Sequence, residues 1–247
     1  MGVRYAIGLP NVGQFGDVRT LLELAVAAEG HGWDGVHLWD HLLYHEPEWP
    51  VASPIVAASA IAAATQRIRI IVTLTLPRRQ VQDVAQDVAA IDALSGQRLT
   101  VVGVIGSMDR EYSEFGLDSD PRARGKALDD RIARLREMWG GPIWAGGRWP
   151  YRRGLRRAAR LDGALLTFEG YHQSNIPVED FQAATAFVKD HGARGEIAVE
   201  GATEGPGSTR TIEPYAEAGL TWWIEALGWW RGDVSAAAAR IAAGSPD

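Results

Sequence analysis

The sequence predicts an α/β protein, a (β/α)8 TIM barrel in which eight parallel strands alternate with eight helices. The chain has 247 residues and 46% hydrophobic residues, which is enough for one large core. Short apolar runs alternate with segments of helical period, and eight such pairs follow one another. Right-handed crossovers would bury both faces of a parallel sheet under helices, and eight strands can close into a barrel. We expect residues 1–247 to form a single domain of this kind.

The first four strand and helix pairs are the clearest. We predict strands at residues 5–9, 35–39, 68–76 and 99–103, followed by helices at 18–31, 54–65, 81–95 and 123–139. The pattern is weaker in the second half of the chain. There we predict strands at 143–145, 164–167, 197–200 and 222–226 and helices at 151–160, 178–189, 209–218 and 233–243. An open doubly wound sheet is the alternative. It is disfavoured because Gly8-Leu9-Pro10-Asn11, and not G-x-G-x-x-G, follows the first strand.

Composition excludes several classes of function. The formal net charge is -6, which argues against nucleic-acid or membrane binding. The chain has no cysteine, so disulfides, thiol catalysis and cysteine metal sites are excluded, and a cytoplasmic location is expected. No apolar run approaches the length of a membrane span. We predict no metal site. Apart from His41, the histidines are not spaced like metal ligands, namely His31, His37, His45, His172 and His191.

In a barrel of this type, chemistry takes place on the loops that follow the carboxyl ends of the strands. This rule turns the predicted fold into a short set of candidate residues. The strand ends carry Asn11, Asp40, His41, Thr73, Leu74, Thr75, Gly106, Ser107, Gly146, Gly147 and Arg148, with Glu169, Glu200 and Glu225 near the remaining ends.

Residues 143–163 combine features that favour an anion. They contain Gly146 and Gly147, which we interpret as a tight turn, and a following helix rich in arginine. Glycines let the backbone approach a ligand closely, and a helix N-terminus presents unpaired N–H groups and positive dipole. Arg148, Arg152 and Arg153 add positive charge. The alternative is an ordinary turn followed by a solvated basic helix face.

Several segments together resemble one family. They are LWDHL at 38–42, AAATQRIRIIVTLTLPRR at 62–79, IDALSGQRLTVVGVIG at 91–106, EYSEFG at 111–116 and WAGGRWPYRRGLRRAARLDG at 144–163. Their order and spacing are similar to those of the bacterial luciferase-like family, from Gly8 to about Gly163. The resemblance implies a barrel that binds reduced FMN or the deazaflavin F420 and catalyses monooxygenation or hydride transfer on a small organic substrate. It also implies a homodimer, and a flavin reductase as a possible supplier of cofactor.

The resemblance assigns roles to the candidate residues. It places His41, with Asp40, beside the cofactor ring, where an imidazole can exchange protons near neutral pH. It implies that Thr73, Leu74 and Thr75 support the ring, that Gly106 and Ser107 make room for it, and that the amides of Gly146 and Gly147 with Arg148 and Arg152 hold the phosphate. Glu111 is a secondary candidate proton donor, although we expect such a loop carboxylate to pair with Arg110 or Arg122.

The chain also departs from the family pattern. A long excursion that precedes the fifth strand in relatives, and helps to wall the pocket, is reduced here to Gly140-Gly141-Pro142. Its loss indicates an open site, a site completed by a partner, or reduced activity. Four tryptophans have two open interpretations, as the lining of an apolar or aromatic substrate pocket or as ordinary core and interface residues, namely Trp33, Trp39, Trp49 and Trp149.

Two other functions remain open. One is a non-catalytic or partner-dependent flavin-binding subunit, for which an exposed aromatic patch of Trp222, Trp223, Trp229 and Trp230 is expected. The other is a sugar-phosphate isomerase or aldolase. It is disfavoured because the available lysines, Lys126 and Lys189, lie at no predicted strand end.

Overall fold

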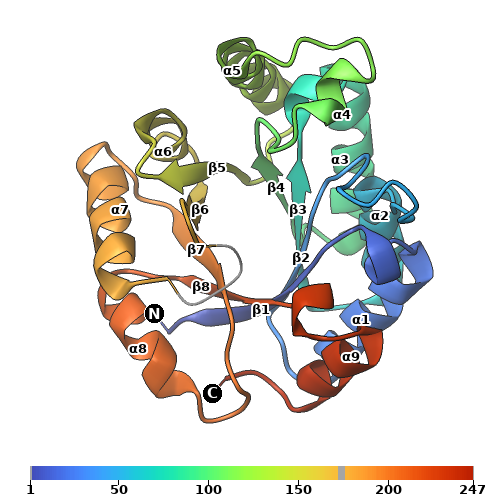
Figure 1. Ribbon diagram of the computed structural model, residues 1–247, viewed down its shortest axis with the longest axis vertical. Helices are drawn as coiled ribbons and strands as arrows, with labels where there is room; N and C mark the ends of the chain where they lie inside the picture. The colour runs from blue at the N-terminus through green and yellow to red at the C-terminus, as the bar shows by residue number, and fades with distance from the viewer. Residues whose placement is uncertain (1, 172–175, 247) are drawn as a thin grey trace.

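The strands close into a parallel barrel with the helices outside it (Figure 1). The computed structural model describes residues 2–171 and 176–246, so His172 lies outside the described residues. Within these ranges the strands are β1 (Arg4–Leu9), β2 (Gly35–Leu38), β3 (Arg69–Leu74), β4 (Leu99–Gly103), β5 (Ile143–Trp149), β6 (Gly163–Phe168), β7 (Glu196–Gly201) and β8 (Trp222–Ala226). Because β1 pairs with β8, the sheet has no open edge and the doubly wound alternative is wrong.

A helix follows each strand, as predicted. These helices are α1 (Val18–Gly30), α2 (Pro54–Ala64), α3 (Val81–Ser95), α5 (Pro121–Met138), α6 (Arg152–Ala158), α7 (Val178–Asp190), α8 (Thr209–Glu217) and α9 (Val234–Ala242). The short helices η1 (Gly13–Phe15), η2 (Leu76–Arg78), α4 (Arg110–Ser113) and η3 (Trp229–Arg231) were not predicted. All four lie in loops that follow the carboxyl ends of strands, so the added structure is at the mouth of the barrel.

Local sequence explains where several helices begin. Ser53, Asp120 and Asp233 accept hydrogen bonds from backbone N–H groups of the first turns of α2, α5 and α9. Pro54 and Pro121 occupy first helical positions, where the missing N–H costs nothing. The helices that cover the barrel therefore start at residues whose side chains favour a helix start.

The core has two layers, one inside the barrel and one between the strands and the helices. Side chains alternate along each strand, so every second residue faces inward. The inner layer is made of Ala6, Ile71, Val102, Trp144, Leu165, Ala198, Trp222 and Ile224. The outer layer is larger and apolar, and it is continuous from β1 around to α9. The two indoles of the inner layer, Trp144 and Trp222, are each 1% exposed and fill the lower barrel.

The shortened connection between α5 and β5 lies at the amino end of the barrel. Gly140, Gly141 and Pro142 border a hollow of about 370 Å³ together with Arg69 and Glu196, the first residues of β3 and β7. The mouth is at the opposite end of these strands. The short connection therefore does not border the mouth.

Two kinds of feature were sought among the described residues, namely a membrane-spanning helix and a group of metal-binding side chains. Within 2–171 and 176–246, no helix combines the length and the apolar character needed to cross a membrane. In the same ranges, His, Cys, Asp and Glu side chains do not gather in groups of three or more that could hold a metal ion.

Candidate functional site

The mouth of the barrel is open above β3 to β7. Thr73 and Gly146, which face inward at the ends of β3 and β5, are half-buried, and the inward-facing Arg148 and Thr167 are exposed. Their outward-facing neighbours on the same strands are buried, as Leu166 illustrates. Solvent therefore reaches the inside of the barrel, and not its outer layer, along these five strands.

Aromatic rings close the other half of the mouth, above β1, β2 and β8. Trp39 stacks on Trp230 with ring centres 5.6 Å apart, and Tyr44 stacks on Trp49 at 6.0 Å. Trp229 lies nearly perpendicular to all four rings, at 4.7 to 6.3 Å from them. We call these five residues the aromatic cap. The cap joins the loop after β2 to the loop after β8.

The cap corrects two expectations about tryptophan. Trp222 and Trp223 are each 1% exposed inside the fold, and Trp229 and Trp230 are half-buried in the cap, so the exposed aromatic patch is absent. Trp33 is also not at the mouth. It precedes β2, is 3% exposed, and donates a hydrogen bond to a carbonyl of α9.

Asp40 is the centre of a buried ionic group. Its carboxylate accepts hydrogen bonds from the Thr75 amide at 2.7 Å and from Arg79 at 2.7 Å, and it lies 3.2 Å from Nη2 of Arg78. Burial opposes ionisation of Asp40, but the charges of Arg79 and Arg78 outweigh it and hold its pKa below the usual value. Asp40 thus fixes the end of β2 to the end of β3, and its oxygens are directed into the protein.

His41 is held beside a buried carboxylate. Its Nδ1 lies 3.1 Å from Oε1 of Glu111, which also accepts the Leu42 amide at 2.6 Å. Glu111 is fully buried and forms an ion pair with Arg78 at 2.9 Å. Burial opposes its ionisation, but the hydrogen bond from His41 and the charge of Arg78 lower its pKa. The predicted pairing of Glu111 with Arg110 or Arg122 is wrong.

The physical reason for that error is the geometry of α4. On this short helix Arg110 is exposed and pairs with Glu114 at 2.6 Å, whereas Glu111 is buried against His41 and Arg78. Asn11 completes the support of His41. Its amide nitrogen donates to the His41 carbonyl at 2.9 Å, and its oxygen accepts the His41 amide at 3.0 Å.

The other residues that were predicted to contact the cofactor ring differ in their exposure to solvent. Leu74 is fully buried in the outer layer, and Thr75 is 1% exposed and bonded to Asp40. Gly106 is half-buried, and Ser107 is exposed beside it. Gly106 has a φ of +76° and its missing Cβ would lie 2.9 Å from Thr75, so only glycine fits. Of these four, only Gly106 and Ser107 reach solvent at the mouth.

The interpretation of Gly146 and Gly147 as a turn is wrong, because both lie in β5, which extends to Trp149. Gly147 pairs with Leu166 of β6. A Cβ on Gly147 would lie 2.8 Å from Leu155, and one on Gly154 would lie 3.2 Å from the Gly146 carbonyl. The glycines are therefore needed because α6 packs closely on β5, and not because the chain turns at this point.

The two arginines predicted to hold a phosphate lie at the rim. Arg148 is exposed and pairs with Glu169 at 3.4 Å. Arg152 begins α6, and its guanidinium lies 5.2 Å from the Trp149 ring and 4.8 Å from the Phe187 ring. No hydrogen bond joins Arg152 to another residue of the described ranges, so its N–H donors remain available to an anion.

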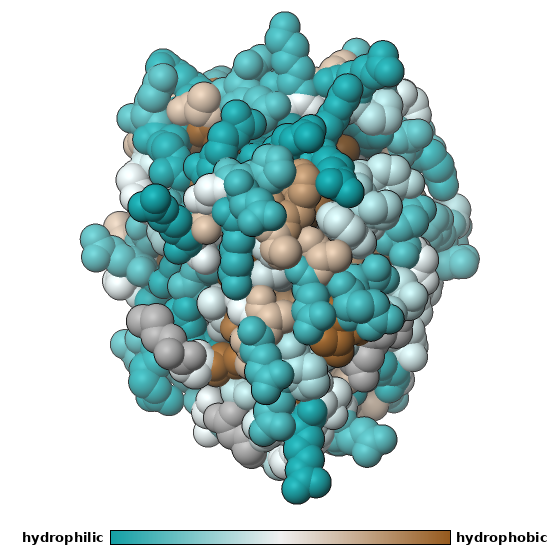
Figure 2. Space-filling model, turned by 90° about the vertical axis from the view of Figure 1, so that its left-hand side faces the viewer, coloured by the Kyte–Doolittle hydropathy of each residue, from teal (hydrophilic) through white to brown (hydrophobic). Residues whose placement is uncertain are grey.

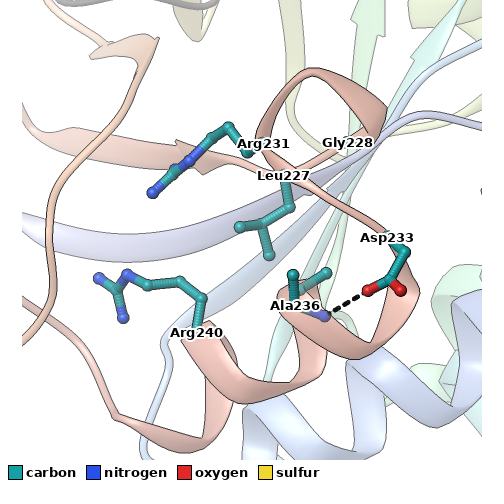
Figure 3. A pocket seen from close by; sticks show the side chains of 7 residues that line it. Leu227, Gly228, Arg231, Asp233, Ala236 and Arg240 are labelled. Atoms are coloured by element: carbon teal, nitrogen blue, oxygen red, sulfur yellow. Dashed lines mark hydrogen bonds between the residues drawn. The ribbon is translucent and has the colours of Figure 1, made fainter.

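A small hollow of about 50 Å³ lies beside α9, away from these residues (Figure 3). Arg231 and Arg240 line it, and both contact the buried Glu225, at 2.6 and 3.5 Å. Their charges are therefore compensated within the protein. The side chain of Asp233 occupies the first turn of α9 by accepting the Ala236 amide, which leaves this hollow without the features of an anion site.

A family model matches this chain, and many solved structures share its fold, among them the following three. The model described as luciferase-like monooxygenase matches residues 5–197, which extends past the limit near Gly163 expected from the sequence. The fold is similar to that of an F420-dependent secondary alcohol dehydrogenase solved with an F420–acetone adduct, with a TM-score of 0.80 and 14% identity over 98% of each chain.

The other two structures also match from end to end. An F420-dependent tetrahydromethanopterin reductase from Methanopyrus kandleri has a TM-score of 0.73 and 13% identity over 99% of each chain. The monooxygenase RslO1 from Streptomyces bottropensis has a TM-score of 0.72 and 16% identity over 98% of this chain and 97% of that one. At these identities the structures establish the barrel fold.

Proposed function

Because this chain belongs to the luciferase-like monooxygenase family, we propose that it is an oxidoreductase that binds F420 or FMN in the open half of the mouth and acts on a small organic substrate. One observation carries the proposal. His41 stands between the aromatic cap and α4, with Nδ1 bonded to the buried Glu111 and no bond from Nε2 to another residue of the described ranges. A ligand in the open half would meet that nitrogen.

The residues at the mouth fit a flavin-type cofactor. Such a molecule carries a flat ring with polar edges and a phosphate-bearing tail. The hydroxyls of Thr73 and Ser107 and the small Gly106 suit the ring, and the guanidinium groups of Arg148 and Arg152 suit the phosphate. Since the amides of Gly146 and Gly147 belong to β5, we assign the anion chiefly to the arginine side chains.

The proton chemistry follows from the bonds of His41. Glu111 is an acceptor at the Leu42 amide, so its carboxylate keeps the proton of His41 on Nδ1. Nε2 is then free to take a proton from a ligand or to return one. Asp40 and Asn11 position His41 through the backbone, while the cap excludes water on its other side. The bound cofactor supplies the electron pair.

Activity tests this proposal directly. The absorbance of F420 is followed with a panel of small alcohols and ketones, and oxygen uptake is followed with reduced FMN. We expect turnover with one cofactor, and a loss of about 10²- to 10⁴-fold in His41→Gln, which is typical for removal of a general acid or base. His31→Gln, at an exposed residue that follows the end of α1, is the matched control. Turnover that is equal in His41→Gln and wild type would remove His41 from the chemistry.

F420 is the cofactor to test first. The alcohol dehydrogenase and the tetrahydromethanopterin reductase described above carry F420 in their names, whereas RslO1 is named a monooxygenase. With F420 the reaction is hydride transfer, and with reduced FMN it is oxygenation supported by a flavin reductase. Oxygen dependence separates the two, because only oxygenation stops under anaerobic conditions.

We also propose that the chain forms a homodimer through α2. This helix has one polar residue, Ser59, and its outer face leaves Val56 53% exposed. Exposed apolar residues flank it, with Val26 on α1 and Leu94 on α3. By contrast, hydrophilic side chains cover most of the side that appears on the left in Figure 1, as Figure 2 shows. In sedimentation, Val56→Asp is expected to be monomeric and wild type dimeric; a monomeric wild type would contradict this.

A further inference from the structure

His37 lies inside the barrel, below the mouth, with both ring nitrogens engaged. It faces inward from β2 and is 2% exposed. Nδ1 lies 2.8 Å from Oε1 of Glu200, and Nε2 lies 2.7 Å from Oγ1 of Thr73. A carboxylate, an imidazole and a hydroxyl therefore form one hydrogen-bonded row, contributed by β7, β2 and β3.

The sequence makes room for this row at one glycine. Glu200 must reach across β8 and β1 to contact β2, and the inward-facing position on β1 is Gly8. A Cβ on Gly8 would lie 3.2 Å from Oε1 of Glu200 and 2.9 Å from Ile224. Trp39 fixes the carboxylate further, because its Nε1 donates to the same oxygen at 3.0 Å.

The row has a buried centre and two ends at the mouth. Thr73 is half-buried and the side chain of Glu200 is 17% exposed, whereas His37 between them is shielded. The other groups that surround His37 from β1, β3 and β8 carry no charge, namely Gly8, Ile71, Ile224 and Ala226. The remaining charged residues on inward-facing strand positions lie elsewhere, with Arg4, Arg69 and Glu196 at the amino end and Arg148 at the end of β5.

The two protonation states of His37 give Thr73 opposite polarities. When the imidazole is neutral with its hydrogen on Nδ1, Nε2 accepts from the Thr73 hydroxyl, whose oxygen can then accept from a ligand. When the imidazole is protonated, Nε2 donates to Thr73, and the hydroxyl hydrogen can turn toward a ligand. The charge of the buried His37 ring therefore determines whether the Thr73 hydroxyl donates to a ligand at the mouth or accepts from it.

We propose, on the basis of the proposed function, that His37 is a second proton-exchanging group of the mouth and takes up one proton when the bound cofactor is reduced. A cofactor held at the mouth would gain one negative charge when reduced by a hydride, which carries two electrons with one proton. His37 takes a further proton from solvent through the Glu200 end of the row, so the sum of added charge is zero. The imidazolium is stabilised by the Glu200 carboxylate, and Thr73 donates toward the new negative charge. His37 acts through Thr73 and is therefore a positioning residue.

The midpoint potential of the bound cofactor, measured against pH by spectroelectrochemistry, tests this without a substrate. F420 is used, or FMN if only FMN binds. Each proton taken up in a two-electron couple adds about 30 mV per pH unit to the slope. We expect the slope in His37→Gln to be shallower by about that amount over the range in which wild type takes up the proton. His31→Gln, at an exposed residue that follows the end of α1, is expected to match wild type. Equal slopes in His37→Gln and wild type would overturn the proposal.

Thr73 and Glu200 supply variants that keep His37 in place. Thr73→Ser is expected to retain the wild-type slope, whereas Thr73→Val and Glu200→Gln each lose part of it. A slope that Thr73→Val leaves unchanged would show that the hydroxyl is no part of the row. If neither F420 nor FMN binds the wild type, the proposed function fails and this inference fails with it. Binding with an unchanged slope contradicts this inference alone.

Nitrogen NMR of histidine-labelled protein gives a readout without cofactor. In wild type, both nitrogens of His37 are expected to show strong hydrogen bonds. Glu200→Gln should move mainly the Nδ1 resonance, because it removes the charge of that partner, and Thr73→Val should move mainly the Nε2 resonance, because it removes the hydroxyl. Both resonances moving alike in either variant would indicate a general disturbance of packing and contradict the row.

Discussion

The half of the mouth above β1, β2 and β8 is filled by five stacked or perpendicular rings, whereas the half above β3 to β7 leaves inward-facing side chains in contact with solvent. The closed half also contains the buried charges of Asp40, Glu111 and Arg78. The open half carries hydroxyls, a small residue and two rim arginines. The difference separates two tasks. The closed half fixes His41, and the open half leaves the space that a cofactor and a substrate would occupy under the proposed function.

Removing the charge of Asp40 should destabilise the closed half, and we expect this variant to have the largest effect on the free energy of unfolding. In Asp40→Asn the guanidinium of Arg78, 2% exposed, and that of Arg79 lose their common counter-ion. Breaking a buried ion pair from one side costs about 3–5 kcal/mol. The expected result is a lower urea midpoint for unfolding with an unchanged slope. Glu114→Gln, which breaks the exposed pair with Arg110, is the control and should cost less than about 1 kcal/mol.

Truncating Trp229 tests the aromatic cap. Trp229 contacts all four other rings of the cap but is half-buried, so Trp229→Ala should lower the free energy of unfolding by about 2–3 kcal/mol, less than for a fully buried tryptophan. The near-UV circular dichroism should also weaken, because the ring contacts are lost. Phe115→Ala, at a ring that is 57% exposed, should leave both measurements nearly unchanged. Similar losses in the two variants would mean that the cap does not join its loops.

Removing Arg152 tests the open half. Its guanidinium is held against Trp149 and Phe187 with its donors available, so Arg152→Ala should weaken cofactor binding by about 1.5–3 kcal/mol, the range for hydrogen bonds to a charged group. Fluorescence titration measures this. Arg153→Ala changes the net charge equally at the next residue and should bind nearly as wild type. Unchanged affinity in Arg152→Ala would remove Arg152 from the site.

The smallest expected effect is a shift in acid sensitivity. The pKa of Glu111 is held below its usual value in the folded protein, so ionised Glu111 stabilises the fold at higher pH. This contribution is lost as the pH falls through the folded pKa. The hydrogen bond from His41 is the largest lowering influence. In His41→Gln the pKa of Glu111 should rise, and stability measured by chemical unfolding should begin to fall at a higher pH than in wild type. Superimposable pH profiles would contradict the pairing.

Periodicity was sufficient to predict the barrel because each strand and helix is a local pattern. β2, β4 and β8 lie within one residue of their predicted bounds at each end. β5 is longer than predicted because two glycines resemble a turn in sequence, and their reason, the close approach of α6, appears only in the packing. A glycine in a strand and a glycine in a turn cannot be told apart when the partner helix is unknown.

The positions of the candidate residues at strand ends were predictable, and their contacts were less so. His41 and Asp40 stand at a strand end, and the strand order alone brings them to the mouth. Their partners come from far along the chain: Glu111 is 70 residues from His41, and Arg79 is 39 residues from Asp40. The aromatic cap joins residues near 40 to residues near 230. No local pattern encodes such contacts, because they depend on which loops close over the same opening.

A parallel titration of the purified protein with F420, FMN and reduced FMN tests the two-halved mouth most directly, with absorbance and tryptophan fluorescence as signals. We expect micromolar binding of one cofactor and quenching of the tryptophan fluorescence of the aromatic cap beside it. His41→Gln should largely retain this affinity, because the role proposed for His41 is proton exchange and not binding of the cofactor. Absence of binding to all three in the folded wild-type protein would contradict the oxidoreductase assignment.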